Sequence, residues 1–182
     1  MERAQIQDKK RVFLANALLF FLFSFLGWAM EKLLFLFVYG ENADRGFLTL
    51  PFCPIYGFSL LFIRFTLGIP LKKNPPYPLN LLSLLAYAVC AALVATAAEL
   101  FTGVFFERVF GVKLWTYADF SRSEYVSLPT SVGWGFLITA AMGGVWAPLE
   151  KLFSRAPVPV LAAGSGGLSL ALLTDFLLTA IA

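Results

Sequence analysis

Four carboxylates in apolar stretches are the side chains of this sequence best placed to do chemistry. They are Glu31, Glu99, Glu107 and Asp175. A carboxylate in such surroundings is costly unless it faces a partner, a cavity or a pathway. Two of these groups could act as acid and base if their environments separate their pKa values. The same groups could instead hold a ligand, or form the ion pairs that keep helices together.

Several kinds of chemistry are excluded by what the sequence lacks. It contains no histidine, which excludes nucleophilic catalysis by histidine-containing sites and every zinc motif that depends on histidine. Its two cysteines, Cys53 and Cys90, lie in separate apolar runs without the spacing of a metal knuckle or a disulfide framework. No phosphate-binding Gly-x-x-x-x-Gly-Lys-Ser/Thr stretch occurs, and no basic run with interleaved aromatics is long enough to indicate nucleic acid. We therefore assign no catalytic residue and expect no metal, no cofactor and no nucleic-acid partner.

Two stretches that contain Leu-Pro mark the starts of helices. In residues 45–58 the prolines suit the first turn of a helix, where N–H groups lack partners anyway. Residues 125–136 repeat Leu-Pro, an aromatic residue and Gly-Phe in the same register, which is typical of an internal repeat. The matched pairs are Leu50 and Leu128, Pro51 and Pro129, Cys53 and Ser131, Tyr56 and Trp134, Gly57 and Gly135, and Phe58 and Phe136.

Composition places the chain in a membrane. Of its 182 residues 59% are hydrophobic and only 14% are charged, whereas ordinary globular chains carry about 25% charged residues. Several apolar runs reach the ~20 residues that a helix needs to cross a hydrocarbon core. We expect an all-α, polytopic transmembrane helical bundle of about five spans, forming a single integral membrane domain over residues 1–182. The expected helices cover about residues 12–39, 51–69, 79–111, 129–153 and 158–182.

Three of the expected helices carry a face suited to packing against protein. Polar or small side chains that recur at three- or four-residue spacing fall on one side of a helix, and small residues let helices approach closely. Pro148 is expected to kink the fourth helix. The faces are Asn16, Phe20, Ser24, Gly27 and Glu31, then Ala88, Ala92, Ala95 and Glu99, and then Ser131, Gly135, Thr139 and Gly143.

Basic residues predict the orientation. Nine of the 14 lysines and arginines lie at ends and loops on the N-terminal side of the bundle, against five on the other side. The positive-inside rule then places the N-terminus in the cytoplasm and, with five spans, the far end outside. The two Leu-Pro stretches would both start inward-going helices from the outer side, as parallel repeats do. Residues 112–128 are expected to form an interfacial loop with aromatic side chains at headgroup depth.

These placements predict one ligand site in the outer half of the bundle. Glu31 and Glu99 would face a shared cavity, and the free N–H groups of two helix starts would favour anionic groups. In the structural alternative Glu31 pairs with Arg45, and Glu107 pairs with Lys113 or with a lipid headgroup. The predicted ligand-binding residues are Glu31, Arg45, Cys53, Tyr56, Glu99, Glu107, Trp115 and Trp134.

One family pattern is visible around the first Leu-Pro stretch. Gly-Trp-Ala-Met-Glu at 27–31, Arg-Gly-Phe-Leu at 45–48 and Pro-x-Cys-Pro-Ile-Tyr-Gly at 51–57 resemble the bacterial membrane family called putative ABC-transporter type IV. Leu-Trp-Thr-Tyr at 114–117 and the second Leu-Pro stretch are also similar to it. The chain differs from the family pattern at Leu50, where glycine is usual, and at Thr116, where an acidic residue is usual. The resemblance covers the chain to about Phe136 and implies a permease-like role.

The resemblance and the missing nucleophile constellations favour a non-enzymatic membrane module. It would be a permease-like or substrate-binding transport component with an outer-leaflet polar site, in the bacterial inner membrane. The alternative is a membrane-embedded enzyme that uses paired carboxylates on a lipid or a small amphipathic substrate. Membrane lipids are the expected partners, and a separate ATPase subunit and a homo-oligomer stay open. Any ATP-driven transport would need that separate subunit, because the chain lacks a P-loop.

Overall fold

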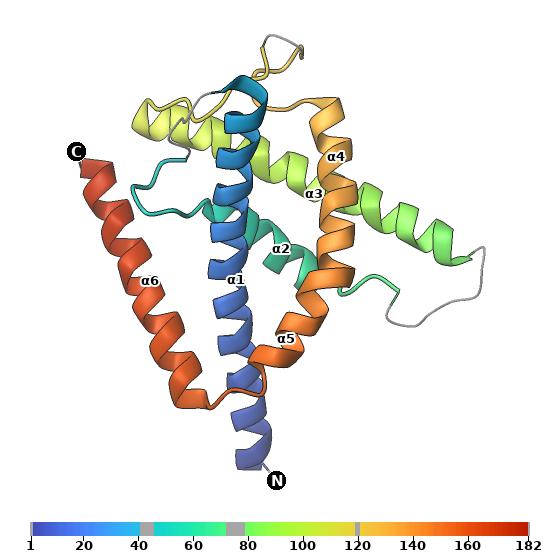
Figure 1. The fold of residues 1–182 in the computed structure, drawn as a ribbon, viewed down its shortest axis with the longest axis vertical. Coiled ribbons are helices and arrows are strands. Elements are labelled where there is room, and N and C mark those ends of the chain that lie inside the picture. The colour runs from blue at the N-terminus through green and yellow to red at the C-terminus, as the bar shows by residue number, and fades with distance from the viewer. Residues whose placement is uncertain (1, 41–45, 72–78, 119–120, 182) are drawn as a thin grey trace. The chain divides into compact units, whose positions relative to one another are not determined.

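The computed structural model describes residues 2–40, 46–71, 79–118 and 121–181, and every regular element in them is a helix. This confirms the all-α prediction, although α1 begins ten residues before the expected start and α2 is shorter than expected at both ends. The helices are α1 (Glu2–Tyr39), α2 (Pro54–Thr66), α3 (Leu79–Phe110), α4 (Leu128–Ala140), the π-helical turn η1 (Ala141–Trp146), α5 (Ala147–Phe153) and α6 (Val158–Ile181) (Figure 1).

Four helical stretches in the described residues are long and apolar enough to cross a membrane. They are Gln7–Phe37, Asn80–Phe110, Leu128–Phe153 and Val158–Ile181. The predicted second span differs, because α2 has only 13 residues, which is roughly 20 Å at 1.5 Å per residue. It begins at Pro54 and not at Pro51, and one reason is that the residue before a proline is pushed out of the helical region.

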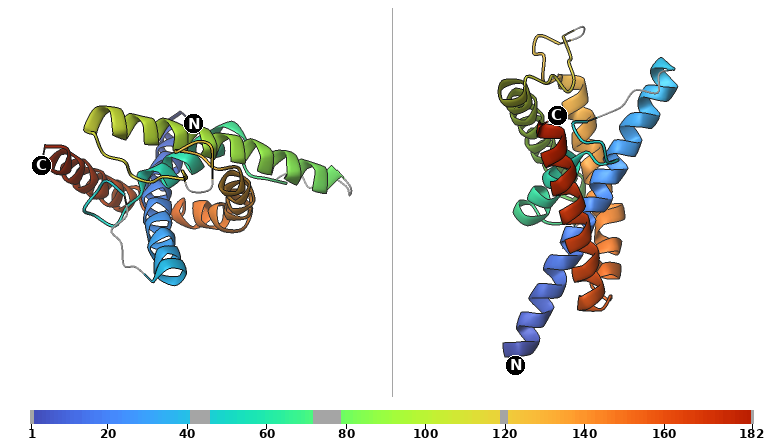
Figure 2. Two further views of the ribbon diagram at one scale, coloured as in Figure 1. Left: turned by 90° about the horizontal axis from the view of Figure 1, so that it is seen from above. Right: turned by 90° about the vertical axis from the view of Figure 1, so that its left-hand side faces the viewer.

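The chain divides into two compact units. Unit 1 contains Met1–Phe58 and Pro148–Ala182, and unit 2 contains Ser59–Ala147. In unit 1, α6 packs against α1 (Figures 1 and 2). In unit 2, α3 crosses α4 and makes the most extensive helix–helix contact of the described residues.

The face predicted on the first helix is buried at four of its five positions, and Glu31 is half-buried. Asn16, Phe20 and Ser24 are all less than a tenth exposed, and Gly27 is buried. The Asn16 amide and the Ser24 hydroxyl each donate one hydrogen bond to a main-chain oxygen one turn earlier. α1 is accordingly the most buried of the four candidate spans.

A non-helical segment, residues 46–53, lies between α6 and α1 and is called here the bridging segment (Figure 1). The Cys53 N–H donates to the Ser24 carbonyl at 2.9 Å, and the Leu50 N–H donates to Asp175 Oδ2 at 3.0 Å. Asp175 Oδ1 also accepts a hydrogen bond from the Thr49 hydroxyl. Backbone groups that no helix satisfies thus obtain partners, which non-helical backbone at membrane depth requires.

Unit 2 is held by close contact between small residues, as predicted. A Cβ added at Gly135 would lie 2.5 Å from the Ala88 carbonyl oxygen and 3.0 Å from the Ala92 side chain. One turn earlier on α4, Ser131 lies 2.7 Å from the Thr96 hydroxyl. The side chains of both helices are therefore small where the backbones approach.

The predicted irregularity at Pro148 takes the form of a wider helical turn. Residues Ala141–Trp146 are π-helical, directly before α5. Proline has no N–H for the carbonyl four residues earlier, here that of Gly144, and its ring collides with that carbonyl. Widening the preceding turn relieves this conflict without ending the helix.

Candidate functional site

The first pair of a carboxylate and an aromatic side chain belongs to unit 1. Glu31 on α1 accepts a hydrogen bond from the Tyr56 hydroxyl in the first turn of α2. The Tyr56 ring covers Gly27, where an added Cβ would lie 2.2 Å from the ring. A Cβ at Gly57 would lie 2.4 Å from the Ser24 hydroxyl and 2.6 Å from the Phe20 carbonyl oxygen. The two glycines therefore permit the approach that brings Tyr56 to Glu31.

The second pair belongs to unit 2. Glu99 on α3 is 8% exposed, and its Oε1 accepts from Trp134 Nε1 at 2.8 Å and from the Tyr117 hydroxyl at 3.2 Å. Trp134 comes from α4 and Tyr117 from the segment after α3. Both donors are neutral, so they fix the direction of the carboxylate oxygen without adding a charge.

The two pairs are built in the same way. In each unit a glutamate on a long helix binds the aromatic residue that precedes a glycine on a second helix. Gly57 approaches the carbonyl oxygen of Phe20, and Gly135 approaches that of Ala88. Phe20 and Ala88 stand at the same distance in sequence before Glu31 and Glu99, respectively. These contacts agree with the register of the predicted repeat, whose parallel orientation stays a prediction.

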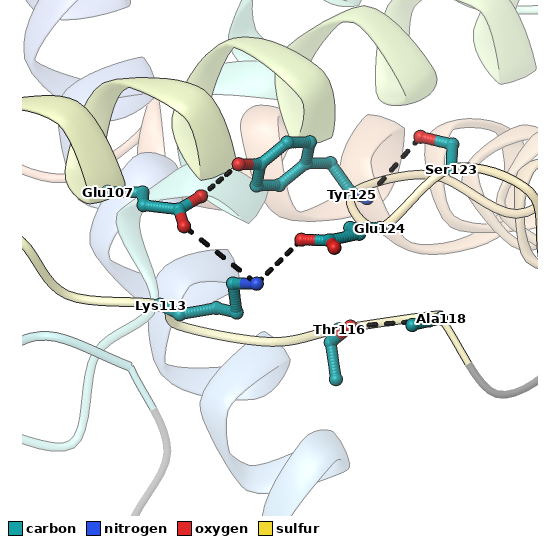
Figure 3. A network of polar contacts seen from close by, with 7 residues as sticks. All are labelled: Glu107, Lys113, Thr116, Ala118, Ser123, Glu124 and Tyr125. Carbon is teal, nitrogen blue, oxygen red and sulfur yellow. Dashed lines mark hydrogen bonds and ion pairs between the residues drawn. The ribbon is translucent and has the colours of Figure 1, made fainter.

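A third glutamate, Glu107 on α3, binds an aromatic side chain from the loop after α3 (Figure 3). Glu107 accepts a hydrogen bond from the Tyr125 hydroxyl. The Tyr125 ring covers Gly103, one turn before Glu107, as the Tyr56 ring covers Gly27 one turn before Glu31. The sequence pattern Gly-x-x-x-Glu thus marks two places where an aromatic ring lies over the glycine and reaches the carboxylate.

Lys113 completes the network of the loop. Its Nζ lies 2.6 Å from Glu124 Oε2 and 3.8 Å from Glu107 Oε1, so the Glu107–Lys113 pair of the structural alternative is present. The hydrogen bond to Glu124 is the main cause that raises the pKa of Lys113. The pKa of Tyr125 is raised above 10.0, chiefly because its hydroxyl donates to Glu107. Trp115 Nε1 also binds the Tyr125 carbonyl oxygen at 3.0 Å.

The predicted site residues therefore fall into three groups. Glu31, Tyr56 and Cys53 lie in unit 1, where the Cys53 side chain is buried and its N–H bonds α1. The pair of Glu99 and Trp134 lies in unit 2, and Glu107 and Trp115 organise the loop. Arg45 lies outside the described residues. The single cavity shared by Glu31 and Glu99 stays a prediction.

Two contributors were absent from the predicted site. Tyr117 binds Glu99, and the Leu-Trp-Thr-Tyr stretch was a signal that could have included it. Asp175 was noted as a carboxylate, but no local pattern links it to Thr49 and Leu50, which stand more than a hundred residues earlier. Among the described residues, no group of three His, Cys, Asp or Glu side chains could hold a metal ion.

A comparison with models of protein families identifies the family of the chain. The model of the family described as Putative ABC-transporter type IV matches residues 18–180. No curated protein and no solved structure matched the chain.

Proposed function

We propose, from the premise that this chain belongs to the putative ABC-transporter type IV family, that it is the permease-like component of a transport system. The family and the four long apolar helices fit a multi-pass membrane protein with a role in transport. An ABC transporter implies an ATPase partner, and this chain has no P-loop of its own. The ATPase would therefore be a separate subunit.

The observation that carries the proposal is the pair of membrane-depth glutamates. Glu31 and Glu99 lie on candidate spans, and each accepts a hydrogen bond from an aromatic side chain of a neighbouring helix. Ionisable groups at this depth usually line a pathway or a binding site. We assign both glutamates to ligand binding, with Tyr56 and Trp134 as the residues that orient them.

The remaining predicted residues receive supporting roles in this proposal. Glu107 and Trp115 would fix the loop at the membrane surface, and the Cys53 backbone would fix the start of α2. The protein would lie in the bacterial inner membrane as a single domain with its N-terminus in the cytoplasm. The basic residues on the N-terminal side of the bundle support this orientation.

The test uses variants that remove charge and keep shape. Glu31→Gln and Glu99→Gln retain an amide oxygen that can accept from Tyr56 and Trp134, so we expect little change in thermal stability. Cellular function should be lost, measured as the phenotype of a deletion strain that expresses each variant at the wild-type level. Glu124→Gln is the matched control, because Glu124 is exposed and outside the spans. Wild-type function in the double Glu→Gln variant would contradict the assignment.

A second measurement tests the partner. The intact protein, purified with its native lipids in mild detergent, should carry a stoichiometric subunit that contains a P-loop and hydrolyses ATP. Turnover of a lipid by the protein alone, without such a subunit, would support the membrane-embedded enzyme instead.

A further inference from the structure

Unit 1 contains a carboxylate receptor made of two adjacent residues. The Thr49 hydroxyl donates to Asp175 Oδ1, and the Leu50 N–H donates to Asp175 Oδ2 at 3.0 Å. These donors stand directly before Pro51, and together they satisfy both oxygens of one carboxylate that is 8% exposed. A hydroxyl and the next backbone N–H thus bind a buried carboxylate of α6.

Unit 2 contains the matching pair of donors, and no described carboxylate binds its hydroxyl. Ser127 and Leu128 stand directly before Pro129, in the register that pairs Pro129 with Pro51. Ser127 is the N-cap residue of α4, with extended backbone and no side-chain cap. It is 1% exposed, and its Oγ has no hydrogen-bond partner among the described residues. The Leu128 N–H belongs to the first turn, where no partner exists within the helix.

The missing partner has a structural cause. Asp175 is supplied by α6, which belongs to unit 1. The described residues of unit 2 contain α3, α4, η1 and the end of α2, and none of these corresponds to α6. Among the described residues of unit 2, no element supplies a carboxylate to the Ser127 hydroxyl.

We propose that the Ser127 hydroxyl and the Leu128 N–H bind the carboxylate of an amphipathic ligand, as Thr49 and Leu50 bind Asp175. The positive end of the α4 dipole favours an anionic group at this position. The adjoining surface is apolar, since Leu128 is 78% exposed, Val132 48% and Phe136 58% on the same helix. A carboxylate with an alkyl chain fits both features, with its chain along α4 in the bilayer. This binding site is independent of the proposed transport role.

The test is direct binding of carbon-13-labelled decanoate to the intact purified protein in nanodiscs. Ser127→Ala should weaken binding roughly tenfold or more, because a hydrogen bond to a charged group contributes at least that factor. Ser127→Thr should keep wild-type affinity, because threonine occupies the equivalent position 49. Ser154→Ala is a distant control, since this exposed hydroxyl only caps its own helix end.

Each contrary outcome is specific. Folding of Ser127→Ala is checked by thermal unfolding, and Ser127→Thr supports the site even if the alanine variant misfolds. Equal displacement of decanoate by decanol would overturn the carboxylate assignment. Equal displacement by acetate would overturn the amphipathic assignment, and equal affinity in wild type and Ser127→Ala would overturn the site. None of these results depends on Glu31 or Glu99, so the transport proposal is tested separately.

Discussion

The three glutamates of the long helices share one kind of partner. Each binds an aromatic side chain that donates a neutral hydrogen bond, from Tyr56 to Glu31, from Trp134 to Glu99 and from Tyr125 to Glu107. Such a side chain buries apolar surface and still satisfies a polar neighbour through its single N–H or O–H. Each of these donors satisfies one carboxylate oxygen of a helix that is long and apolar enough to cross a membrane.

The hydrogen bond from Tyr125 to Glu107 predicts a shifted titration. The pKa of Tyr125 is raised above the ordinary 10.0 because its neutral hydroxyl donates the hydrogen bond to Glu107. The contribution of this bond to stability is therefore present below about pH 10 and is lost as the pH rises through the higher pKa of the folded protein. We expect the tyrosinate absorbance that Tyr125→Phe removes to have a midpoint above pH 10.

Glu107→Gln provides the control for this titration. The amide removes the negative charge, so the Tyr125 midpoint should move back toward 10.0. An unchanged midpoint in this variant would show that another group, and not Glu107, raises the pKa of Tyr125.

At the level of elements, the recurring unit is a long helix joined to a shorter one that begins near Leu-Pro. α1 and α2 meet where Gly57 approaches the Phe20 carbonyl, and α3 and α4 meet where Gly135 approaches the Ala88 carbonyl. In both cases the glycine follows the aromatic residue that binds the glutamate. Close backbone approach and carboxylate binding are therefore produced by the same short stretch of sequence.

The α3–α4 contact predicts opposite effects of two glycine substitutions on one helix. Gly135→Ala places a Cβ 2.5 Å from the Ala88 carbonyl oxygen, which should cost about 1–3 kcal/mol, as overpacking does. Gly133→Ala meets nothing within 4 Å, and should be neutral or stabilise the helix by up to ~1 kcal/mol. The free energy of unfolding in mixed detergent micelles measures both. Equal effects of the two substitutions would contradict the close approach at Gly135.

For the whole molecule, the main question is how the chain crosses the membrane between α1 and α3. α2 alone covers roughly 20 Å, less than a ~30 Å hydrocarbon core. The bridging segment adds to this length only in part, because it bends at residues 46–47 and 49–51. Its N–H groups at Leu50 and Cys53 already have protein partners. A composite crossing by residues 46–66 would keep the five-span topology that the basic residues predict.

Reporter fusions test this topology. With a composite crossing and the N-terminus inside, reporters placed after Lys73 and after Arg155 should both read cytoplasmic, since each would follow an inward crossing. An external reading after Lys73 would mean that residues 46–66 re-enter the same side, leaving four crossings. Asp175→Asn is expected to destabilise the bridging segment without changing the reporter readings. The amide still offers one acceptor oxygen to Thr49 or Leu50.

The sequence by itself determined the class of protein and most helix positions. Long apolar runs can be satisfied in a bilayer only as helices, so composition and length were sufficient for α1, α3, α4 and α6. Three- and four-residue spacing also predicted the buried face of α1 and the small-residue contact at Gly135. Local pattern was enough in these cases because the residues involved share one helix.

Only the tertiary structure decided which donors meet which carboxylates. The contact of Asp175 with Thr49 and Leu50 joins residues far apart in the sequence, and no periodicity reports such a contact. The same holds for Tyr117 at Glu99, since the loop must fold back over α3 before its hydroxyl can reach the carboxylate. That the buried Ser127 hydroxyl has no partner among the described residues is likewise visible only when burial and hydrogen bonds are known. Sequence periodicity describes the faces of single helices, whereas the pairing of groups between elements depends on how those elements pack.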